Sequence, residues 1–312
     1  MDIPANPLEW KVGLIGYGEV GRILAEDLRQ RGVAVSAHDI KLGTEQQLSL
    51  VTHAQQHGVR LCISHAALAR DADLLISAVT ASQTLAAAKA CAPVQTQAIF
   101  LDLNSASPGV KQQSSESVEA VGGRYLEAAV MTSLPPYRIG VPLLIGGPHA
   151  AGLVEPLSQL GFAPKAVDGN LGQVSATKMC RSVMIKGLEA MLIESLTAAR
   201  HYGVETVVLD SLCETFPDID WERQATYMFG RVIAHGRRRA EEMQEAALTI
   251  SEAGLEPWSA AGTAERQAWM AKLTESGRFD QQDHRVLATG SDWRTQADRI
   301  LAARPKLKSE DH

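Results

Sequence analysis

The chain has 312 residues, 45% of them hydrophobic, and a formal net charge of −6 at pH 7. This length accommodates two domains or one large domain. The acidic balance and the scattered lysines and arginines argue against nucleic acid or an anionic membrane as the main partner. No run of about 18 apolar residues predicts a membrane span, and the first ten residues show no signal-peptide pattern, so none is expected.

The cysteines are widely spaced and form no CxxC or Cys/His metal pattern; they are Cys62, Cys91, Cys180 and Cys213. Three of them lie in apolar segments, as buried free thiols do. This use of cysteine favours a reducing cytoplasm. No histidine shows metal-ligand spacing, so no metal is expected.

The stretch Lys11–Asp39 predicts a nucleotide-binding unit. Lys11–Ile15 reads as a strand, an amphipathic helix follows, Gly32 closes that helix, and Val33–Asp39 reads as the next strand. Between strand and helix stands a GxGxxG motif, made of Gly16, Tyr17, Gly18, Glu19, Val20 and Gly21. Strand, glycine-rich turn, helix, strand and acid follow one another here in the order of a dinucleotide-binding motif.

Each part of this motif has a mechanical use. Gly16 permits the tight turn, Gly18 lets the backbone approach a pyrophosphate, and Gly21 lets the helix pack on the strand. The helix N-terminus offers free N–H groups and its dipole to the phosphates. Asp39 stands where an acid accepts hydrogen bonds from the ribose hydroxyls, and its charge favours NAD over NADP. Lys41, two residues on, leaves NADP possible.

The first half continues as alternating strands and helices. Helices are expected at Glu45–Gln56, Ala66–Arg70, Ser82–Ala90 and His149–Leu160, and one more begins at Ser107 and Pro108. Strands are expected at Val59–Ser64, Leu74–Val79, Ala98–Asp102, Arg124–Ala129, Val141–Ile145 and Ala163–Val167, with a loop at Met131–Gly140. This order predicts an α/β fold with a Rossmann-type, doubly wound and mostly parallel sheet. Ligands of such sheets bind at the carboxyl ends of the strands.

The second half changes character. From Ser175 a long helix begins whose apolar residues fall on every side, so it is expected to be buried nearly all round. Further helices are expected at Thr206–Phe216, Trp221–His235, Arg237–Ala253, Ser259–Thr274 and Asp292–Ala303, the last bracketed by Ser291 and Pro305. The expected domains are a nucleotide-binding domain (1–168), a long interdomain helix (169–200), an all-helical substrate and dimerisation domain (201–305) and a frayed tail (306–312).

This arrangement resembles the β-hydroxyacid dehydrogenase superfamily, which includes 3-hydroxyisobutyrate and 6-phosphogluconate dehydrogenases. The chain looks like a divergent, 6-phosphogluconate-dehydrogenase-like branch with its own C-terminal domain. Besides the nucleotide motif, the segments that carry the resemblance are Val79-Thr80, Asp102–Pro108, Glu127–Ser133, Gly146-Gly147 and Gly169–Ser182. Lys178 matches the catalytic lysine of the family, whereas Ser182 replaces its asparagine. The resemblance implies an interlocking homodimer, which sedimentation would test.

The resemblance also implies the roles of individual residues. Lys178 would be the general acid/base of hydride transfer between NAD(P) and a small β-hydroxy acid. The substrate would contact Ser105, Met131, Thr132, Ser133 and Ser182. Beyond the nucleotide motif and Asp39, the cofactor would contact Val79, Thr80 and Asn104. The altered loop at Met131–Ser133 indicates a rebuilt substrate pocket.

Several alternatives stay open. Imine reductases share this architecture but generally replace the lysine, and a non-catalytic NAD-sensing module would also fit the altered loop. Decarboxylation after oxidation lacks its general acid, because Ile185 stands where relatives have glutamate. Arg138 could clamp a carboxylate or phosphate. Lys186 could contact substrate but is expected to pair with Glu189. His235, with Arg237–Arg239 beside it, is expected at the surface.

Overall fold

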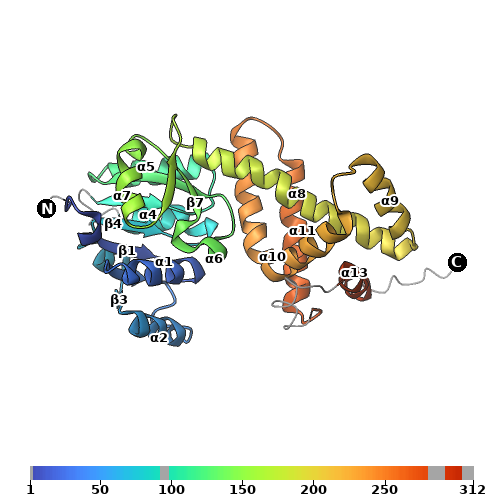
Figure 1. Cartoon of the computed structure of the whole chain (residues 1–312), viewed down its shortest axis with the longest axis horizontal. Helices are drawn as coiled ribbons and strands as arrows, with labels where there is room; N and C mark the ends of the chain where they lie inside the picture. Colours follow the sequence, from blue (N-terminus) through green and yellow to red (C-terminus); the bar gives the residue numbers. More distant parts are fainter. Residues whose placement is uncertain (1–2, 92–97, 280–291, 304–312) are drawn as a thin grey trace. The chain divides into compact units, whose positions relative to one another are not determined.

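The computed structural model describes residues 3–91, 98–279 and 292–303. The expected tail at 306–312, with Ser291 and Pro305, lies outside these residues. Contacts between Cα atoms divide the chain into two compact units, Met1–Cys180 and Arg181–His312, coloured blue to green and green to red in Figure 1. Among the described residues, no helix is both long and apolar enough to cross a membrane.

The first unit is built on an eight-stranded sheet in the order β3-β2-β1-β4-β5-β6-β7-β8. Its strands are β1 (Lys11–Ile15), β2 (Ala34–His38), β3 (Arg60–Leu61), β4 (Leu74–Ser77), β5 (Ile99–Asp102), β6 (Arg124–Val130), β7 (Pro142–Gly146) and β8 (Ala163–Ala166). All neighbouring strands are parallel except β6 and β7. The expected Rossmann-type, mostly parallel sheet is confirmed.

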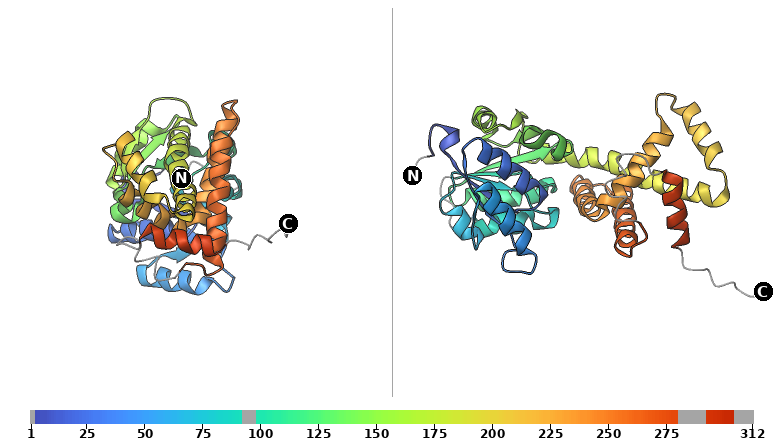
Figure 2. Two further views of the ribbon diagram at one scale, coloured as in Figure 1. Left: turned by 90° about the vertical axis from the view of Figure 1, so that its right-hand side faces the viewer. Right: turned by 60° about the horizontal axis from the view of Figure 1, so that its bottom comes forward.

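Helices cover both faces of this sheet (Figures 1 and 2). One core lies under α1 (Glu19–Gln30), α2 (Gln47–His57) and α7 (Ala150–Gln159). The other lies under α3 (His65–Ala69), α4 (Thr84–Cys91) and α5 (Pro108–Glu119). Because β4 and β5 are covered on both sides, every residue of these two strands is buried, as their continuous apolar runs predict.

Local sequence signals account for several boundaries in this unit. Ser107 caps α5, its hydroxyl accepting from the backbone N–H of Val110, and Pro108 is the first helical residue, as expected. Two expectations were wrong in detail. The strand expected at Val59–Ser64 shrinks to the two residues of β3. The loop expected at Met131–Gly140 contains the short helix α6 (Leu134–Tyr137) and a 3₁₀ turn.

The second unit is helical in all its described elements. It contains most of α8 (Gln173–Tyr202), which begins in the first unit, and the helices α9 (Glu205–Thr215), α10 (Trp221–Glu252), α11 (Trp258–Glu275) and α13 (Trp293–Ala302). Its core combines Leu196 of α8 with Phe229 of α10, Met270 of α11 and Trp293 of α13. Asp220 and Asp292 cap α10 and α13 with their carboxylates.

One expectation for these helices needs correction, and one is confirmed. The helix α8 is not buried all round, because Met184 and Met191 are 74% and 62% exposed. These two side chains lie seven residues apart and therefore on one face. The homodimer stays a prediction. Met184 and Met191 give α8 an exposed apolar face. The break expected between the helices Trp221–His235 and Arg237–Ala253 is confirmed as a kink in α10, whose backbone leaves helical geometry at His235 (φ −134°, ψ 16°).

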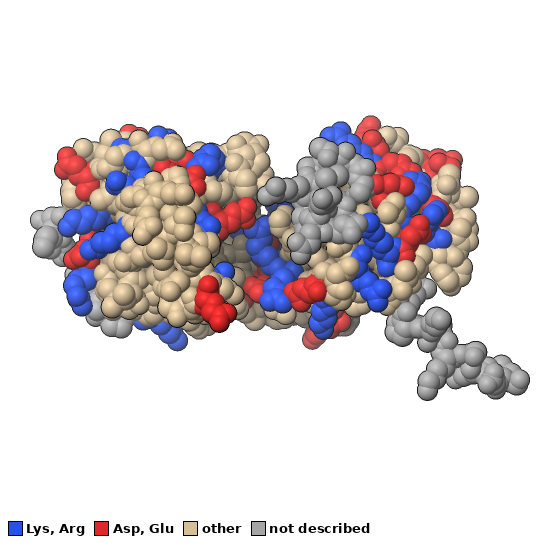
Figure 3. Space-filling view, turned by 90° about the horizontal axis from the view of Figure 1, so that it is seen from below, with Lys and Arg blue, Asp and Glu red and all other residues tan. Residues whose placement is uncertain are grey.

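The surface and the cysteines agree in part with expectation. On the face seen from below, basic side chains lie beside acidic ones rather than forming one basic field (Figure 3). All four cysteines are free, but only Cys62 and Cys91 are buried, whereas Cys180 and Cys213 are exposed. The expectation of three buried thiols was therefore too high by one.

Candidate functional site

The carboxyl ends of β2, β1, β4 and β5 lie at one level of the sheet, and β6 passes through the same level at Glu127. His38, Ile15, Ser77, Asp102 and Glu127 are register partners in that order, from β2 to β6. Four of these residues are polar and buried. A row of buried polar side chains needs partners, because an unpaired buried polar group is costly. Those partners come from the loops and helices that follow the strands and from a neighbouring strand. The row therefore lies at the edge at which a doubly wound sheet binds its ligand.

The turn after β1 has the geometry that dinucleotide binding requires. Gly16 has a φ of +88°, which favours glycine, and a Cβ there would lie 2.5 Å from the carbonyl oxygen of Ala78. A Cβ on Gly21 would lie 2.2 Å from the carbonyl oxygen of Gly16. A Cβ on Gly18 would point into open space. Two glycines are thus required by the protein itself, while Gly18 leaves room for a ligand to approach the backbone.

The N-terminus of α1 is open to such a ligand. Gly18 is the N-cap residue, and no side chain caps the helix. The backbone N–H groups of Glu19, Val20 and Gly21 are the first of the helix, where an anion is stabilised by the orphan donors and the dipole. The side chain of Glu19 is exposed. The residues present therefore fit a pyrophosphate, whose charges the backbone would bind.

Asp39 is fixed beside this turn. One carboxylate oxygen accepts from the backbone N–H of Tyr17 at 2.8 Å, and the other accepts from that of Lys41 at 2.9 Å. The Tyr17 side chain points into the protein, where its hydroxyl lies 2.8 Å from Nδ1 of His53. Burial raises the pKa of Tyr17 to about 12, so the phenol stays protonated. Tyr17 can thus contact a cofactor with its backbone, and Asp39 with a preoriented carboxylate.

Asn104 joins the loops after β4 and β5. Its side-chain oxygen accepts from the backbone N–H of Val79 at 2.7 Å, and its amide nitrogen donates to the hydroxyl of Ser77 at 2.8 Å. The structure therefore brings together Val79 and Asn104, which the sequence assigns to the cofactor. Thr80 follows Val79 directly, and Ser105 is half-buried next to Asn104. Because Asn104 is only 4% exposed, its hydrogen bonds mainly fix the shape of this edge of the sheet.

Below Asn104 lies a buried ion pair that sequence reasoning missed. Lys111 Nζ is 2.9 Å from one oxygen of Asp102, and the hydroxyl of Tyr125 donates to the other at 2.7 Å. Burial and the nearby Asp102 carboxylate raise the pKa of Tyr125, which keeps the phenol as a donor. The backbone N–H of Asn104 also donates to Asp102. Because the charge of Asp102 is paired and hydrogen-bonded, it holds the loop after β5 in place.

Glu127 connects the same edge to α8. It is fully buried, and its carboxylate accepts from the backbone N–H groups of Gly172 (2.7 Å), Ser175 (3.1 Å) and Val174 (3.4 Å). A carboxylate at a helix N-terminus pairs with the orphan donors and with the helix dipole. Gly146 permits this approach, because a Cβ there would lie 3.0 Å from Glu127 Oε1 and 2.8 Å from a methyl group of Val174.

Lys178 lies on the first turns of α8, after the residues bound by Glu127, and is half-buried. The strand β6 ends at Val130, and the backbone N–H of the next residue, Met131, donates to the carbonyl oxygen of Pro142. Thr132 and Ser133 follow and are exposed. These residues and Lys178 all belong to the first unit. Ser182 belongs to the second, where its hydroxyl accepts from Lys186 at 3.1 Å.

The structure gives Arg138 a different role from the clamp considered above. Its guanidinium donates to Asp27 and Glu26 of α1, both at 2.7 Å. Its backbone has a φ of +53°, so these bonds fix an unusual conformation for a residue with a side chain. Although burial raises the pKa of Glu26, hydrogen bonds from His53 and Arg138 lower it overall. Arg138 thus fastens the loop after β6 to α1.

Other charged residues of the second unit also have their own partners. Lys186 pairs with Glu242 at 2.8 Å rather than with Glu189, so that expectation was wrong. Glu189 instead pairs with the buried Arg239. His235 is exposed at the kink of α10, and Arg237 pairs with Glu275 at the surface, as expected of this segment. The placement of Arg239 inside the unit was not expected.

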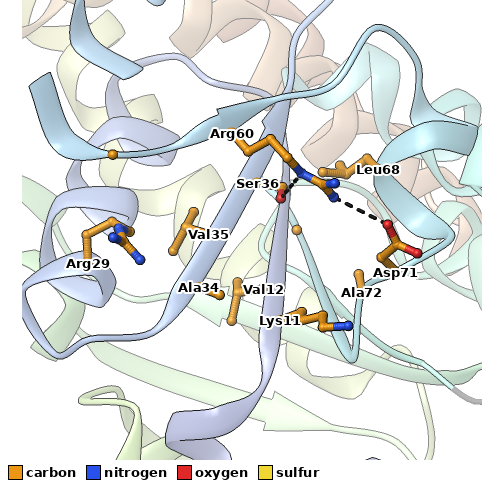
Figure 4. Close-up of a pocket in the computed structure, with 12 residues that line it drawn as sticks. Lys11, Val12, Arg29, Ala34, Val35, Ser36, Arg60, Leu68, Asp71 and Ala72 are labelled. Atoms are coloured by element: carbon orange, nitrogen blue, oxygen red, sulfur yellow. Dashed lines mark hydrogen bonds and ion pairs between the residues drawn. The ribbon is translucent and has the colours of Figure 1, made fainter. Parts of the chain in front are cut away.

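A hollow of about 340 Å³ lies elsewhere in the first unit (Figure 4). It is lined by Lys11 and Ala34, the first residues of β1 and β2, and therefore lies at the amino ends of the strands. Its Arg60 already bonds Ser36 and pairs with Asp71. Because ligands of doubly wound sheets bind at the carboxyl ends, this hollow is not the candidate site.

The glycine geometry makes a testable prediction. Gly18→Ala is expected to leave the melting temperature unchanged but to weaken NADH binding, because its Cβ occupies the open approach to the backbone. Gly21→Ala is expected to weaken NADH binding and also to lower the melting temperature, because its Cβ collides with Gly16. Thermal unfolding without cofactor and NADH titration by fluorescence would check both. Equal melting temperatures for the two variants would contradict this reading of the turn.

Comparisons with known families match both units. Residues 11–105 match the family described as NADP oxidoreductase, coenzyme F420-dependent. This segment contains the glycine-rich turn, Asp39, Val79 and Asn104. Residues 199–270 match a domain of unknown function, DUF1932. That segment covers α9, α10 and most of α11. The first match and the geometry of the turn agree on NAD(P) as the cofactor.

Solved structures extend the likeness to nearly the whole chain. A conserved hypothetical protein from Sinorhizobium meliloti is 34% identical, with a TM-score of 0.72, over 94% of this chain and 96% of its own. A conserved protein of unknown function, reported as structurally similar to 3-hydroxyacid dehydrogenases, is 30% identical, with a TM-score of 0.65, over 85% and 98%. The 3-hydroxyisobutyrate dehydrogenase of Mycobacterium tuberculosis, at 13% identity, shares the fold over 94% and 99%, with a TM-score of 0.63. The chain belongs to the β-hydroxyacid dehydrogenase superfamily, in a branch that combines an NAD(P)-binding domain with a DUF1932 helical domain.

Proposed function

We propose that the protein is an NAD(P)-dependent dehydrogenase or reductase that transfers a hydride between nicotinamide and a small β-hydroxy acid. The observation that carries this proposal is the bond between Glu127 and the N-terminus of α8. It fixes the helix that bears Lys178 to the sheet edge that also bears the nucleotide turn. A lysine fixed at this edge supports proton transfer beside a bound nicotinamide.

The chemistry requires one hydride and one proton to leave the substrate. When bound, NAD⁺ accepts the hydride, with its electron pair, from the carbinol carbon. Lys178, in its neutral form, takes the hydroxyl proton, so that the C–O bond becomes a carbonyl. In the reverse direction the protonated Lys178 returns this proton. The hydroxyl of Ser105 and the backbone of Thr132 and Ser133 are proposed to bind the substrate carboxylate, with Ser182 as a further hydroxyl.

We further propose NAD rather than NADP as the preferred form. Both oxygens of Asp39 accept backbone hydrogen bonds, which fixes a negative charge next to the turn. That charge would accept the ribose hydroxyls of NAD and repel the 2′-phosphate of NADP. The positive charge of Lys41, whose backbone N–H donates to the same carboxylate, opposes this preference because it would attract a 2′-phosphate.

A paired substrate and cofactor screen tests the proposal. β-Hydroxy acids that differ in chain length and substituent are offered with NAD⁺ and with NADP⁺, and cyclic imines and β-keto acids with the reduced cofactors. Turnover of a β-hydroxy acid, with a higher kcat/KM for NAD⁺, is expected. Reduction of a cyclic imine but of no keto acid would replace this function by imine reduction. Tight NADH binding without any turnover would favour the NAD-sensing module.

A further inference from the structure

A cluster of metal-binding side chains lies between α1 and α2, at residues that the proposed reaction does not use. Glu26 of α1 and His53 and His57 of α2 each offer one ligand atom, and these atoms all lie within 4.8 Å of one another. The two helices are neighbours in the first unit (Figures 1 and 2). All three side chains are half-buried, so an ion could reach them from solvent.

The spacing of these residues suits one ion. His53 and His57 are four residues apart in α2, which places both rings on one face of the helix, and the rings are 4.4 Å apart. The sequence interpretation that no histidine has metal-ligand spacing therefore missed this pair. Glu26 comes from a neighbouring helix and brings an oxygen to within 2.9 Å of Nε2 of His53. Two imidazoles and a carboxylate are a common ligand set of Zn²⁺.

The surrounding residues orient the ligands. The hydroxyl of Tyr17 lies 2.8 Å from Nδ1 of His53, and Nε2 of the same ring faces Glu26. If Nδ1 donates its proton to Tyr17, the lone pair of Nε2 points to the cluster, as in metal sites where an outer oxygen selects the histidine tautomer. Arg138 binds the other oxygen of Glu26 at 2.7 Å, which leaves Oε1 directed at the histidines.

We propose that Glu26, His53 and His57 bind a divalent transition-metal ion of the zinc class, with Tyr17 and Arg138 as outer residues. An ion with bonds of about 2.0 Å to Nε2 and Oε1 needs these atoms slightly farther apart than they are now. It takes the place of the proton on Nε2 of His53 that faces Glu26, and the neutral ring then carries its proton on Nδ1, where Tyr17 accepts it. Three protein ligands leave one position for water. The ion joins α2 to α1 and, through Tyr17, to the glycine-rich turn.

Titration of metal-free, untagged protein with Co²⁺ at neutral pH tests this site. Co²⁺ is the probe because it has visible absorption and binds where Zn²⁺ binds. One equivalent per chain, displaced by Zn²⁺, is expected for the wild type. His57→Gln removes one ligand but leaves the contacts of His53 with Tyr17 and Glu26, and it is expected to abolish binding. His201→Gln is the matched control, because it removes an exposed histidine of the second unit and is expected to bind like the wild type.

Tyr17→Phe separates a built site from a fortuitous group of ligands. It retains all three ligands but removes the outer hydroxyl, and it is expected to weaken Co²⁺ binding by about 10–100-fold. Zn²⁺ is also expected to raise the melting temperature of the wild type and of His201→Gln, but not that of His57→Gln. Absence of stoichiometric binding to the wild type would overturn the proposal. Undiminished binding by His57→Gln would do the same, since the ion would then be elsewhere.

Discussion

Replacing Lys178 with alanine is expected to lower kcat by about 10²–10⁴-fold, the usual contribution of a general acid or base. The dissociation constant of NADH is expected to stay unchanged, because the proposed cofactor contacts lie in the loops after β1, β2, β4 and β5. Steady-state turnover of the substrate found by the screen, together with NADH titration by fluorescence, would measure the two effects separately.

The matched control is Lys165→Ala, which removes an exposed lysine of β8 in the same unit. It is expected to turn over like the wild type. A wild-type kcat in Lys178→Ala would remove this residue from the chemistry, even if the rest of the site proved correct. A raised dissociation constant for NADH with an unchanged kcat would instead assign Lys178 to cofactor binding.

Replacing Glu127 with alanine is expected to damage both stability and turnover. The backbone N–H groups of Gly172, Val174 and Ser175 would lose their acceptor inside the protein. Unpaired buried donors of this kind cost on the order of 3 kcal/mol together. For a unit of this size, such a loss lowers the melting temperature by roughly 6–12 °C. Because the N-terminus of α8 would no longer be fixed, kcat is expected to fall while NADH still binds.

Two further variants test this reading of Glu127. Glu127→Gln keeps the shape but offers one acceptor oxygen and a competing donor, so its melting temperature is expected to lie between those of alanine and wild type. Glu119→Ala removes an exposed carboxylate at the end of α5 and is expected to have no effect. If Glu127→Ala melted like Glu119→Ala, the contact with α8 would contribute nothing to stability.

The parts of the fold that depend on local signals could be predicted from the sequence. The strand Lys11–Ile15, the turn after it and the cap at Ser107 each follow from neighbouring residues, and the structure confirms them. The break expected between two helices at His235 is also confirmed, as the kink in α10, although packing of α10 against α11 continues past it. Gly236 permits that packing, since a Cβ there would lie 3.0 Å from the backbone of α11.

The partners of charged side chains could not be predicted in the same way. Glu189 is the local choice for Lys186, but the fold brings Glu242 to it from 56 positions farther along the chain. The sequence marked Glu127 only as the first residue of a segment that resembles a family motif, whereas its carboxylate accepts from backbone N–H groups 45 to 48 residues away. Such pairs depend on how strands and helices pack, which no local pattern contains.

The bonds of Arg138 have a consequence for protein engineering. The segment from Met131 to Tyr137 begins at the end of β6, where the backbone N–H of Met131 donates to Pro142, and is followed by Arg138, which two carboxylates hold to α1. Both ends of this short segment are therefore fixed by contacts outside it. Its interior sequence can be exchanged with that of relatives while Arg138, Asp27 and Glu26 are retained. Because Met131, Thr132 and Ser133 are proposed to contact the substrate, libraries confined to these positions are expected to alter the choice of substrate on an unchanged scaffold.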